Sequence, residues 1–329
     1  MAKKKVELKV KNSLNSKAKI IKTTKIAKKK SEKTNPKQEA PVKLDMRKIQ
    51  EEIQKAMTDH DQIQDQRKPV VEKIEKANHK TGVPSQEYIK TGIPGFDELF
   101  TNGIPRGTSV LVCGGPGSGK TIFCLQTLAY GAAHGEKCLY MTFEESEERL
   151  KSHMRDFGWE PDKLIKKGNL VIKRYDPFEV TRQVEAMLEK AKGELLIDVK
   201  PMLFPKGFKP DRVAVDSLSA IASAFVGKQD TYRIYIEQLF RLLEEMKSTS
   251  FLIAESTDVP VKLTQSGVEE FLADGVIIMY NIQKENIREN AVEILKIRGE
   301  KFKKKVVALE IMGGKGIVVY PEQEVFEAV

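Results

Sequence analysis

Between residue 86 and the C-terminus, the spacing of hydrophobic positions changes several times between two periods. Short apolar runs predict buried strands at 109–113, 137–143, 169–175, 212–216 and 251–254. Apolar residues spaced three and four apart predict helices from Thr121 onward, over 180–191 and over 232–246. Strands that alternate with helices indicate an α/β fold, with a mostly parallel twisted sheet flanked by helices.

The end of the chain shows a different pattern. Four more strand candidates follow without helices between them, at 275–280, 292–297, 306–311 and 316–319. Consecutive strands with short connections pair as hairpins, so we expect C-terminal antiparallel strands that extend the sheet. Together the two patterns predict one large domain over residues 86–329.

The N-terminal part divides into two segments. Residues 1–40 contain 14 lysines, no arginine and three glutamates, with only scattered apolar residues, so we expect residues 1–41 to be a disordered lysine-rich tail. Residues 42–85 are predicted to be a helical extension, because apolar residues recur at helical spacing from Met46 to Ile63. This extension would pack on the body of the protein or on a neighbouring subunit; a free coiled coil is the lesser alternative.

The net charge of +9 belongs to the tail. Beyond residue 40 the chain has 42 basic and 44 acidic residues, so the folded body is nearly neutral. The tail could be a solvating segment or an arm that contacts nucleic acid. The segment 201–210, PMLFPKGFKP, could be a stacking surface for single strands or, as we favour, a structured surface loop.

Cysteine content and hydropathy suggest the compartment. The three cysteines, Cys113, Cys124 and Cys138, lie in apolar contexts without metal-ligand spacing, which is typical of small buried residues in a reducing environment. No apolar run reaches the length of a membrane span, and the lysine-rich N-terminus lacks the apolar core of a secretory signal. We therefore expect a cytoplasmic protein that does not insert into membranes.

A phosphate-binding loop is the clearest chemical motif. The sequence GGPGSGKT lies between a predicted strand and a predicted helix, and comprises Gly114, Gly115, Pro116, Gly117, Ser118, Gly119, Lys120 and Thr121. In such a loop the backbone N–H groups surround phosphate oxygens, the lysine reaches the β- and γ-phosphates, and the hydroxyl binds Mg²⁺. The motif predicts a nucleoside triphosphate with Mg²⁺ as ligands.

Three carboxylates could complete this site. Asp216 ends an apolar strand and could hold the Mg²⁺ shell, or it could cap the next helix. Glu144 and Glu145 directly follow the strand predicted at 137–143, at the sheet edge where α/β folds bind ligands. One of them could orient an attacking water, or both could be acids at a helix N-terminus.

Two cations near the C-terminus allow two interpretations. Lys296 and Arg298 lie on one face of a predicted strand because side chains alternate along it. They could form a solvated stripe or reach the γ-phosphate of a nucleotide in a neighbouring subunit.

Over residues 88–320 the chain resembles the KaiC-like ATPases of the RecA superfamily. Besides GGPGSGKT, the resemblance rests on five segments: TGIPGFDELFTNGIPRG (91–107), TFEESEERL (142–150), RVAVDSLSA (212–220), GVEEFLADGVIIM (267–279) and EILKIRG (293–299). It implies a RecA-like P-loop NTPase core that uses ATP and Mg²⁺.

The resemblance also implies roles for individual residues. Glu144 would act on the attacking water and share in metal binding with Thr121 and Asp216, while Glu145 would support it. Lys296 and Arg298 would contact ATP bound to the adjacent subunit, so the working unit would be a homo-oligomeric ring, typically a hexamer.

The sequence departs from the family at two places. Glu269-Glu270-Phe271 resembles the non-phosphorylated domain of the clock protein, and Glu300-Lys301-Phe302 replaces the T-x-H that follows K-x-R-G in the family. A circadian role is therefore not expected. The function predicted is an ATP-hydrolysing ring that regulates or assembles unidentified protein partners. The alternatives are a nucleic-acid-binding ATPase similar to recombinase paralogues and a nucleotide-dependent structural adaptor with little turnover.

Overall fold

The computed structural model describes residues 87–191, 199, 203–256, 262–264, 266–284 and 287–325. The chain divides into two compact units, Met1–Val83 and Pro84–Val329, and all described residues belong to the second. The predicted tail (1–41) and helical extension (42–85) lie outside the described residues.

The second unit alternates strands and helices before it ends in four strands. In chain order its elements are β1 (Tyr88–Ile89), η1 (Asp97–Leu99), β2 (Ile104–Pro105), β3 (Ser109–Gly114), α3 (Lys120–Ala133), β4 (Cys138–Thr142), α4 (Glu147–Asp156), α5 (Pro161–Lys166), β5 (Leu170–Arg174), α6 (Pro177–Lys190), β6 (Arg212–Asp216), α8 (Leu218–Ala224), α9 (Gln229–Met246), β7 (Thr249–Glu255), α10 (Glu269–Leu272), β8 (Gly275–Lys284), β9 (Ile287–Ile297), β10 (Val306–Met312) and β11 (Gly316–Glu324).

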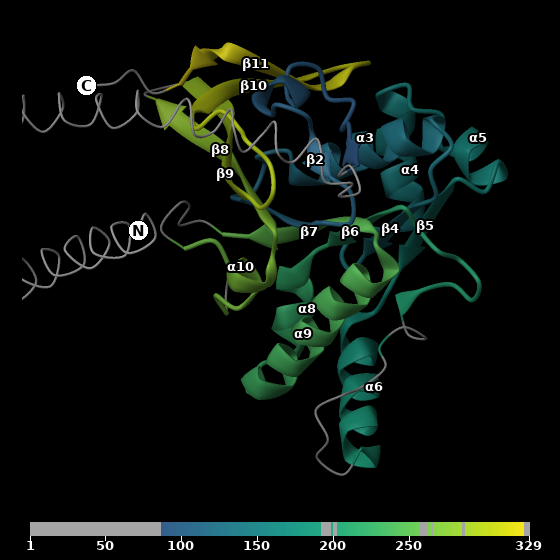
Figure 1. Cartoon of the computed structure of the whole chain (residues 1–329). Helices are drawn as coiled ribbons and strands as arrows, with labels where there is room; N and C mark the ends of the chain where they lie inside the picture. Colours follow the sequence, from purple (N-terminus) through teal and green to yellow (C-terminus); the bar gives the residue numbers. More distant parts are fainter. Residues whose placement is uncertain are drawn as a thin grey trace, which may run out of the picture. The chain divides into compact units, whose positions relative to one another are not determined.

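Nine of the strands form one sheet in the order β11-β10-β9-β8-β3-β7-β6-β4-β5. The strands from β8 through β5 in this order are parallel, whereas β9, β10 and β11 continue the sheet in antiparallel hairpins. The α/β fold predicted from the sequence, with its antiparallel C-terminal extension, is confirmed (Figure 1).

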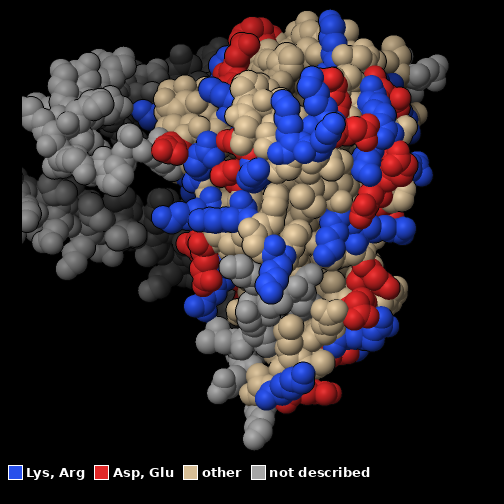
Figure 2. All heavy atoms as spheres, turned by 90° about the vertical axis from the view of Figure 1, so that its right-hand side faces the viewer, with Lys and Arg blue, Asp and Glu red and all other residues tan. Residues whose placement is uncertain are grey.

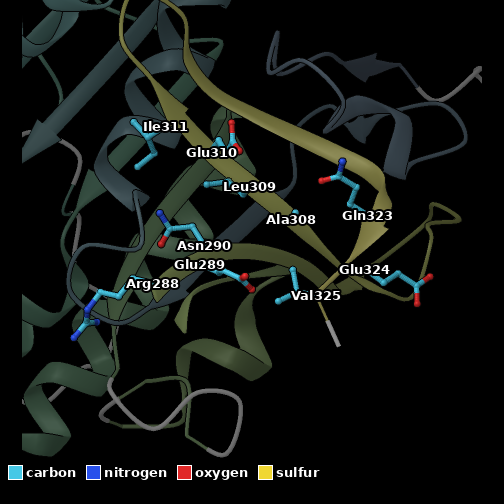
Figure 3. A pocket seen from close by; sticks show the side chains of 10 residues that line it. All are labelled: Arg288, Glu289, Asn290, Ala308, Leu309, Glu310, Ile311, Gln323, Glu324 and Val325. Carbon is cyan, nitrogen blue, oxygen red and sulfur yellow. The ribbon is translucent and has the colours of Figure 1, made fainter. Parts of the chain in front are cut away.

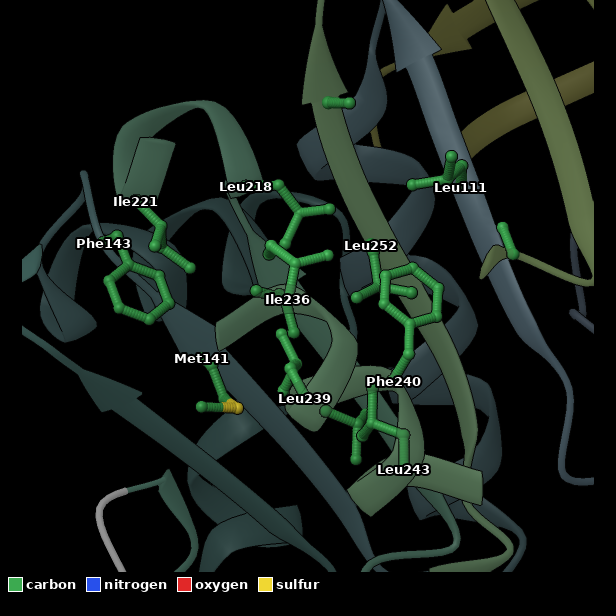
Figure 4. Packing of buried hydrophobic residues seen from close by; sticks show 14 of the residues in the cluster. Leu111, Met141, Phe143, Leu218, Ile221, Ile236, Leu239, Phe240, Leu243 and Leu252 are labelled. Carbon is green, nitrogen blue, oxygen red and sulfur yellow. The ribbon is translucent and has the colours of Figure 1, made fainter. Parts of the chain in front are cut away.

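Helices cover both faces of the parallel strands, with α3, α4 and α5 on one side and α6, α8 and α9 on the other (Figure 1). Side chains alternate between the faces, so Val110 and Val112 of β3 belong to one hydrophobic cluster while Leu111 and Cys113 belong to the other. Because both sides of β3 are buried, its residues from Val110 to Cys113 are apolar without interruption. Figure 4 shows that α9 contributes residues such as Ile236 to the cluster that contains Leu111 and Cys113.

Short helices were harder to predict than strands. The nine strands of the main sheet match the predicted ones, although β8, β9 and β11 are longer than expected, and the two-residue strands β1 and β2 were not predicted. The hydrophobic pattern does not predict α5, α8 or α10, which have six, seven and four residues and therefore show little periodicity. It also left α4 open, because only Leu150 and Met154 of this charged helix are buried.

The segment around residue 205 was interpreted either as a structured surface loop or as a surface on which single strands could stack, and its packing supports the surface loop. Leu203 and Phe204 are buried in the cluster beside α9, and Phe208 packs against it. A ring that is buried in the core does not present a face for bases to stack on, so the segment from 203 to 208 is a packed surface loop.

The cysteines and the surface agree with the composition. All three cysteines are free and buried, and burial raises the pKa of Cys113 and Cys138 to about 12. Among the described residues, no helix is long and apolar enough to cross a membrane. Lys and Arg are interspersed with Asp and Glu on the face that Figure 2 shows, as expected for a nearly neutral body.

Candidate functional site

The glycine loop runs from the end of β3 to the start of α3. Gly117 and Gly119 have φ values of 74° and 95°, a region that residues with a Cβ rarely occupy. A Cβ on Gly114 would lie 2.2 Å from the carbonyl oxygen of Met279, so only glycine lets β3 approach β8 there. The loop therefore needs glycine both for its turns and for close backbone packing, as the motif predicts.

Four of the eight predicted loop residues and all three predicted carboxylates line one pocket of about 470 Å³, whereas Gly114, Gly115, Pro116 and Ser118 do not line it. It is lined by Gly117, Gly119, Lys120, Thr121, Ile122, Glu144, Glu145, His153, Asp156, Phe157, Asp216, Glu255 and Ile311. These residues come from several separate parts of the chain. The parallel sheet brings them together because β3, β6 and β4 end at the same edge.

Lys120 lies at the bottom of this pocket with only 6% of its surface exposed. Its Nζ donates a hydrogen bond of 2.9 Å to the carbonyl oxygen of Gly115 and lies 3.7 Å from a carboxylate oxygen of Glu255. The ammonium group is thus held inside the loop, where a phosphate would meet it.

Asp216 is a pocket residue and not a helix cap. Its Oδ2 accepts hydrogen bonds from the Thr121 hydroxyl at 2.9 Å and the Tyr140 hydroxyl at 2.6 Å. Burial raises the pKa of Asp216 to about 6, although these two hydrogen bonds act in the opposite direction. Helix α8 is capped instead by Ser217, whose Oγ accepts from the backbone N–H of Ala220 at 3.1 Å.

Glu144 and Glu145 have different surroundings. The Ser217 hydroxyl donates to Glu144 Oε1 at 2.6 Å, which links Glu144 to the end of β6. Glu145 instead forms an ion pair of 3.0 Å with Arg149. Helix α4 begins only at Glu147, so neither residue is part of its first turn and the helix-acid interpretation does not apply to them.

The oxygen donors of the pocket fit Mg²⁺. A hydroxyl from Thr121 lies against the carboxylate of Asp216, and Glu144 lines the same pocket. Mg²⁺ prefers such hard oxygens, usually one or two carboxylates together with phosphate oxygens and water. Within the described part of the chain, no group of three or more His, Cys, Asp or Glu could hold a metal ion.

Lys296 and Arg298 are not part of this pocket. Lys296 pairs with Val276 in the sheet, and the neighbouring Gly275 pairs with Val110, near the start of β3. The glycine loop begins beyond Gly114, four strand residues or about 13 Å farther along. The two cations therefore lie at the opposite edge of the sheet, where the parallel strands begin, and are out of reach of the glycine loop of the same chain.

Both cations contact the segment around α10. Lys296 Nζ donates to the carbonyl oxygens of Ala273 at 2.6 Å and Glu270 at 3.2 Å, and burial lowers its pKa. Arg298 forms a 3.2 Å ion pair with Asp274, yet its side chain is 58% exposed. The solvated-stripe interpretation does not describe Lys296, which is half-buried and bound to main-chain oxygens.

Three residues that were not predicted to belong to the site contact the predicted side chains. Tyr140 and Ser217 bind the carboxylates of Asp216 and Glu144, and Glu255 lies beside Lys120. Ser217 directly follows Asp216, so its position in the chain was a usable signal. Tyr140 and Glu255 could be found only from the neighbours of β6 and β3 in the sheet.

A larger pocket of about 900 Å³ lies elsewhere, between β9, β10 and the end of β11 (Figure 3). It is lined by Arg288, Glu289, Asn290, Ala308, Leu309, Glu310, Ile311, Gln323, Glu324 and Val325. None of the predicted site residues lines it. The chemistry of the predicted site therefore identifies the smaller pocket as the functional candidate.

A glycine loop between a central strand and a helix, beside a carboxylate that ends the next strand but one in the sheet, defines a P-loop nucleotide-binding protein. The model of the KaiC ATPase family matches residues 89–324, and the chain belongs to this family. Family membership confirms the resemblance seen in the sequence and supports nucleotide binding in this pocket.

Individual relatives agree with this assignment. The chain is 35% identical over 238 residues to the circadian clock protein KaiC3 of Synechocystis and 32% identical over 236 residues to the circadian clock oscillator protein KaiC of Prochlorococcus marinus. These matches cover 71% and 70% of the chain but 46% and 45% of the relatives, so the chain spans about half their length. The crystal structure of a KaiC-like protein from Pyrococcus horikoshii matches with a TM-score of 0.58 and 33% identity, covering 72% of this chain and 100% of the other.

Proposed function

We propose that this protein binds ATP with Mg²⁺ and hydrolyses it to ADP and phosphate. The observation that carries the proposal is the convergence of Lys120, Thr121, Asp216 and Glu144 in one pocket. These side chains supply a phosphate-binding cation, oxygen ligands for a metal and a second carboxylate that can act on water. Phosphoryl transfer to water needs these three kinds of group.

Each residue has a distinct part in the reaction. Lys120 binds the β- and γ-phosphates, and Thr121 and Asp216 hold the Mg²⁺ shell, with Glu144 as a further oxygen donor. Glu144 also orients the attacking water and accepts its proton, and the 2.6 Å hydrogen bond from Ser217 fixes the direction of its carboxylate. Bound Mg²⁺ supplies neutralisation of the phosphate charge.

The working unit in this proposal is a homo-oligomeric ring, most simply a hexamer. Lys296 and Arg298 lie at the edge of the sheet opposite the glycine loop. One chain therefore cannot bring both its glycine loop and these two cations to the same nucleotide. In a closed ring, a neighbouring chain can supply Lys296 and Arg298 to the nucleotide. The side chain of Arg298 is 58% exposed and can therefore reach a nucleotide bound to another chain. Family membership supports the same arrangement.

The ring would regulate or assemble protein partners. The nearly neutral body, with 42 basic and 44 acidic residues beyond residue 40, favours protein partners over nucleic acid for this part of the chain. Nucleic acid binding has one observation in its favour, the 14 lysines of the tail, and is the second candidate. A ring that responds to ATP binding with little turnover is the third.

The decisive test is Glu144→Gln, with ATP binding measured by calorimetry and turnover by phosphate release. We expect nearly unchanged affinity and turnover lowered about 10²- to 10⁴-fold, because the water loses its positioning base. Glu148→Gln, which neutralises an exposed carboxylate paired with Arg155, is the matched control. Turnover that falls only in Glu145→Gln would reverse the roles of the two glutamates, and a wild-type protein that binds ATP without hydrolysing it would favour the adaptor.

The partner can be sought with the same variant. A Glu144→Gln ring held in its ATP state should retain bound proteins that mass spectrometry can identify. Stimulation of wild-type turnover by single-stranded or duplex DNA, lost when the tail is removed, would favour the nucleic-acid alternative instead.

A further inference from the structure

Glu255 lies where β7 ends, directly beside the glycine loop. Its backbone pairs with Gly114 in the sheet, and its carboxylate is 3.7 Å from the Nζ of Lys120. The backbone there is fixed on both sides: the N–H of Glu255 donates to Ser219 Oγ at 2.8 Å, and the N–H of Ser256 donates to the Gly114 carbonyl at 3.2 Å. The sheet thus fixes the backbone position from which the carboxylate approaches Lys120.

The pocket has an excess of negative side chains. Of the described residues that line it, Lys120 is the sole lysine or arginine, whereas the acidic ones are Glu144, Glu145, Asp156, Asp216 and Glu255. The side chain of Lys120 is 7% exposed, and that of Glu255 is 47% exposed. An ion pair with one buried member is screened less by solvent than a pair on the open surface.

A nucleotide phosphate must approach the same ammonium group. Lys120 already donates one hydrogen bond to Gly115, and Glu255 lies within ion-pair distance on another side. A phosphate oxygen that binds Lys120 therefore meets a carboxylate of the same charge close by. Either the carboxylate turns away toward solvent, which its exposure permits, or the two anions repel each other.

We propose that Glu255 competes with the phosphates of the nucleotide for Lys120 and thereby lowers the affinity of the pocket for ATP and ADP. The proposal rests on the proposed function, since it concerns the same site. Glu255 is a positioning residue that acts through Lys120. It keeps the lysine paired when the pocket holds no nucleotide and takes it back as ADP leaves, so product release is faster than it would be with a neutral residue.

The test compares Glu255→Gln with the wild-type protein, using calorimetry with ATP and with ADP at constant Mg²⁺. Gln keeps the size of the side chain and removes its charge, so we expect both dissociation constants to fall about three- to tenfold. Because the competition is electrostatic, the difference should shrink in 0.5 M salt. In steady-state hydrolysis, KM should fall while kcat stays level or decreases as ADP release slows.

Two further variants separate this effect from a structural one. Glu255→Asp keeps the charge and should remain closer to the wild-type affinity than Glu255→Gln, and Glu255→Ala should show the same tightening as Gln. Glu245→Gln removes a carboxylate from another ion pair, with Arg241 on α9, and should leave both affinities unchanged. It controls for the change in net charge.

The outcomes distinguish the inference from the proposed function. Unchanged or weaker ATP affinity in Glu255→Gln and Glu255→Ala, with melting temperatures like that of the wild type, overturns the role of Glu255 and leaves the ATPase proposal intact. A wild-type protein that binds neither ATP nor ADP contradicts the proposed function, and the inference with it.

Discussion

The two edges of the central sheet hold their charged residues in different ways. At the edge where the glycine loop lies, functional side chains bind one another: Thr121 to Asp216, and Ser217 to Glu144. At the opposite edge, Lys296 binds main-chain carbonyl oxygens next to α10, and Arg298 pairs with Asp274 beside them. The first edge holds the pocket that these side chains line or support, whereas the second holds a pair of oriented cations outside that pocket.

Exposure sharpens this contrast. The side chain of Lys120 is 7% exposed and that of Arg298 is 58% exposed. A buried lysine in a finished pocket has its ligand defined by the same chain. The guanidinium of Arg298 contacts Asp274 and the carbonyl oxygen of Phe271, and its exposure would suit it, in the proposed ring, to a ligand that another molecule brings. In the proposed ring, one chain would therefore carry parts of two different sites.

The largest effect is expected at the open edge. Arg298→Ala should lower turnover about 10³- to 10⁵-fold, because an arginine supplied in trans stabilises the charge that develops on the transferred phosphoryl group. Mixing Arg298→Ala with Glu144→Gln subunits should partly restore turnover, since some interfaces then combine an intact Glu144 with an intact Arg298. Phosphate release measured over a range of mixing ratios checks this.

The control for that experiment is Lys303→Ala, which removes an exposed cation paired with Glu322 in the same part of the chain. It should leave turnover within about twofold, as for surface ion pairs generally. If native mass spectrometry shows mixed rings and turnover stays at the level of the single mutants, the trans assignment of Arg298 is wrong.

At the edge where the glycine loop lies, Lys120→Ala should abolish measurable ATP binding. Each charge-assisted hydrogen bond to a phosphate contributes about 1.5–3 kcal/mol, so the loss of Lys120 should weaken binding by one to two orders of magnitude or more. Lys137→Ala is the matched control, because Lys137 also donates to a glycine carbonyl but does so outside the pocket. If calorimetry gives an ATP affinity within twofold of that of the wild type, the glycine loop is not the phosphate-binding site.

A smaller effect should follow from Tyr140→Phe. The change removes a 2.6 Å hydrogen bond to the buried Asp216, which should lower the free energy of unfolding by about 1–3 kcal/mol. Tyr235→Phe is a close control: within the described part of the chain, the buried Tyr235 hydroxyl has no hydrogen-bond partner. Equal urea-unfolding midpoints for the two variants would show that the Tyr140 bond contributes little.

Removal of residues 1–40 should have the smallest effect on hydrolysis. The segment has 14 lysines and few apolar residues, so we expect the truncated protein to keep its ATPase activity and melting temperature. If the tail binds nucleic acid, its removal should weaken binding and reduce the slope of the salt dependence by about 0.7–0.9 for each phosphate that the tail neutralises. Equal nucleic acid binding by both proteins at low salt would exclude that role.

Much of the fold could be predicted from the sequence because each strand of the main sheet contains a short, largely apolar run bounded by a change of period. The glycine loop and Asp216 were predictable for the same reason, since the loop follows such a strand and Asp216 ends one. The bounds of α6 were less predictable: Asp176 caps it and Pro177 begins it, three residues before the first position of the predicted helix. Start signals of this kind lie outside the hydrophobic pattern.

Other features depend on the order of strands in the sheet, which the sequence does not reveal. Glu255 meets Lys120 because β7 lies beside β3, and Tyr140 meets Asp216 because β4 lies beside β6. The positions of Lys296 and Arg298 likewise follow from β9 running antiparallel to β8, which carries the end of β9 back to the far edge. The sequence predicted that they share one face of a strand, but β9 ends at Ile297 and Arg298 lies in the turn that follows it. The edge at which the two cations lie was not predicted.

The separation of the two edges has a consequence for how the protein would behave on dilution. If each hydrolysis site needs Glu144 from one chain and Arg298 from the next, specific activity is a property of the population of assembled rings and not of the single chain. It should then fall steeply below the concentration at which rings dissociate, while a site within one chain would be insensitive to dilution. The decline of activity with dilution would thus measure how strongly the subunits hold together.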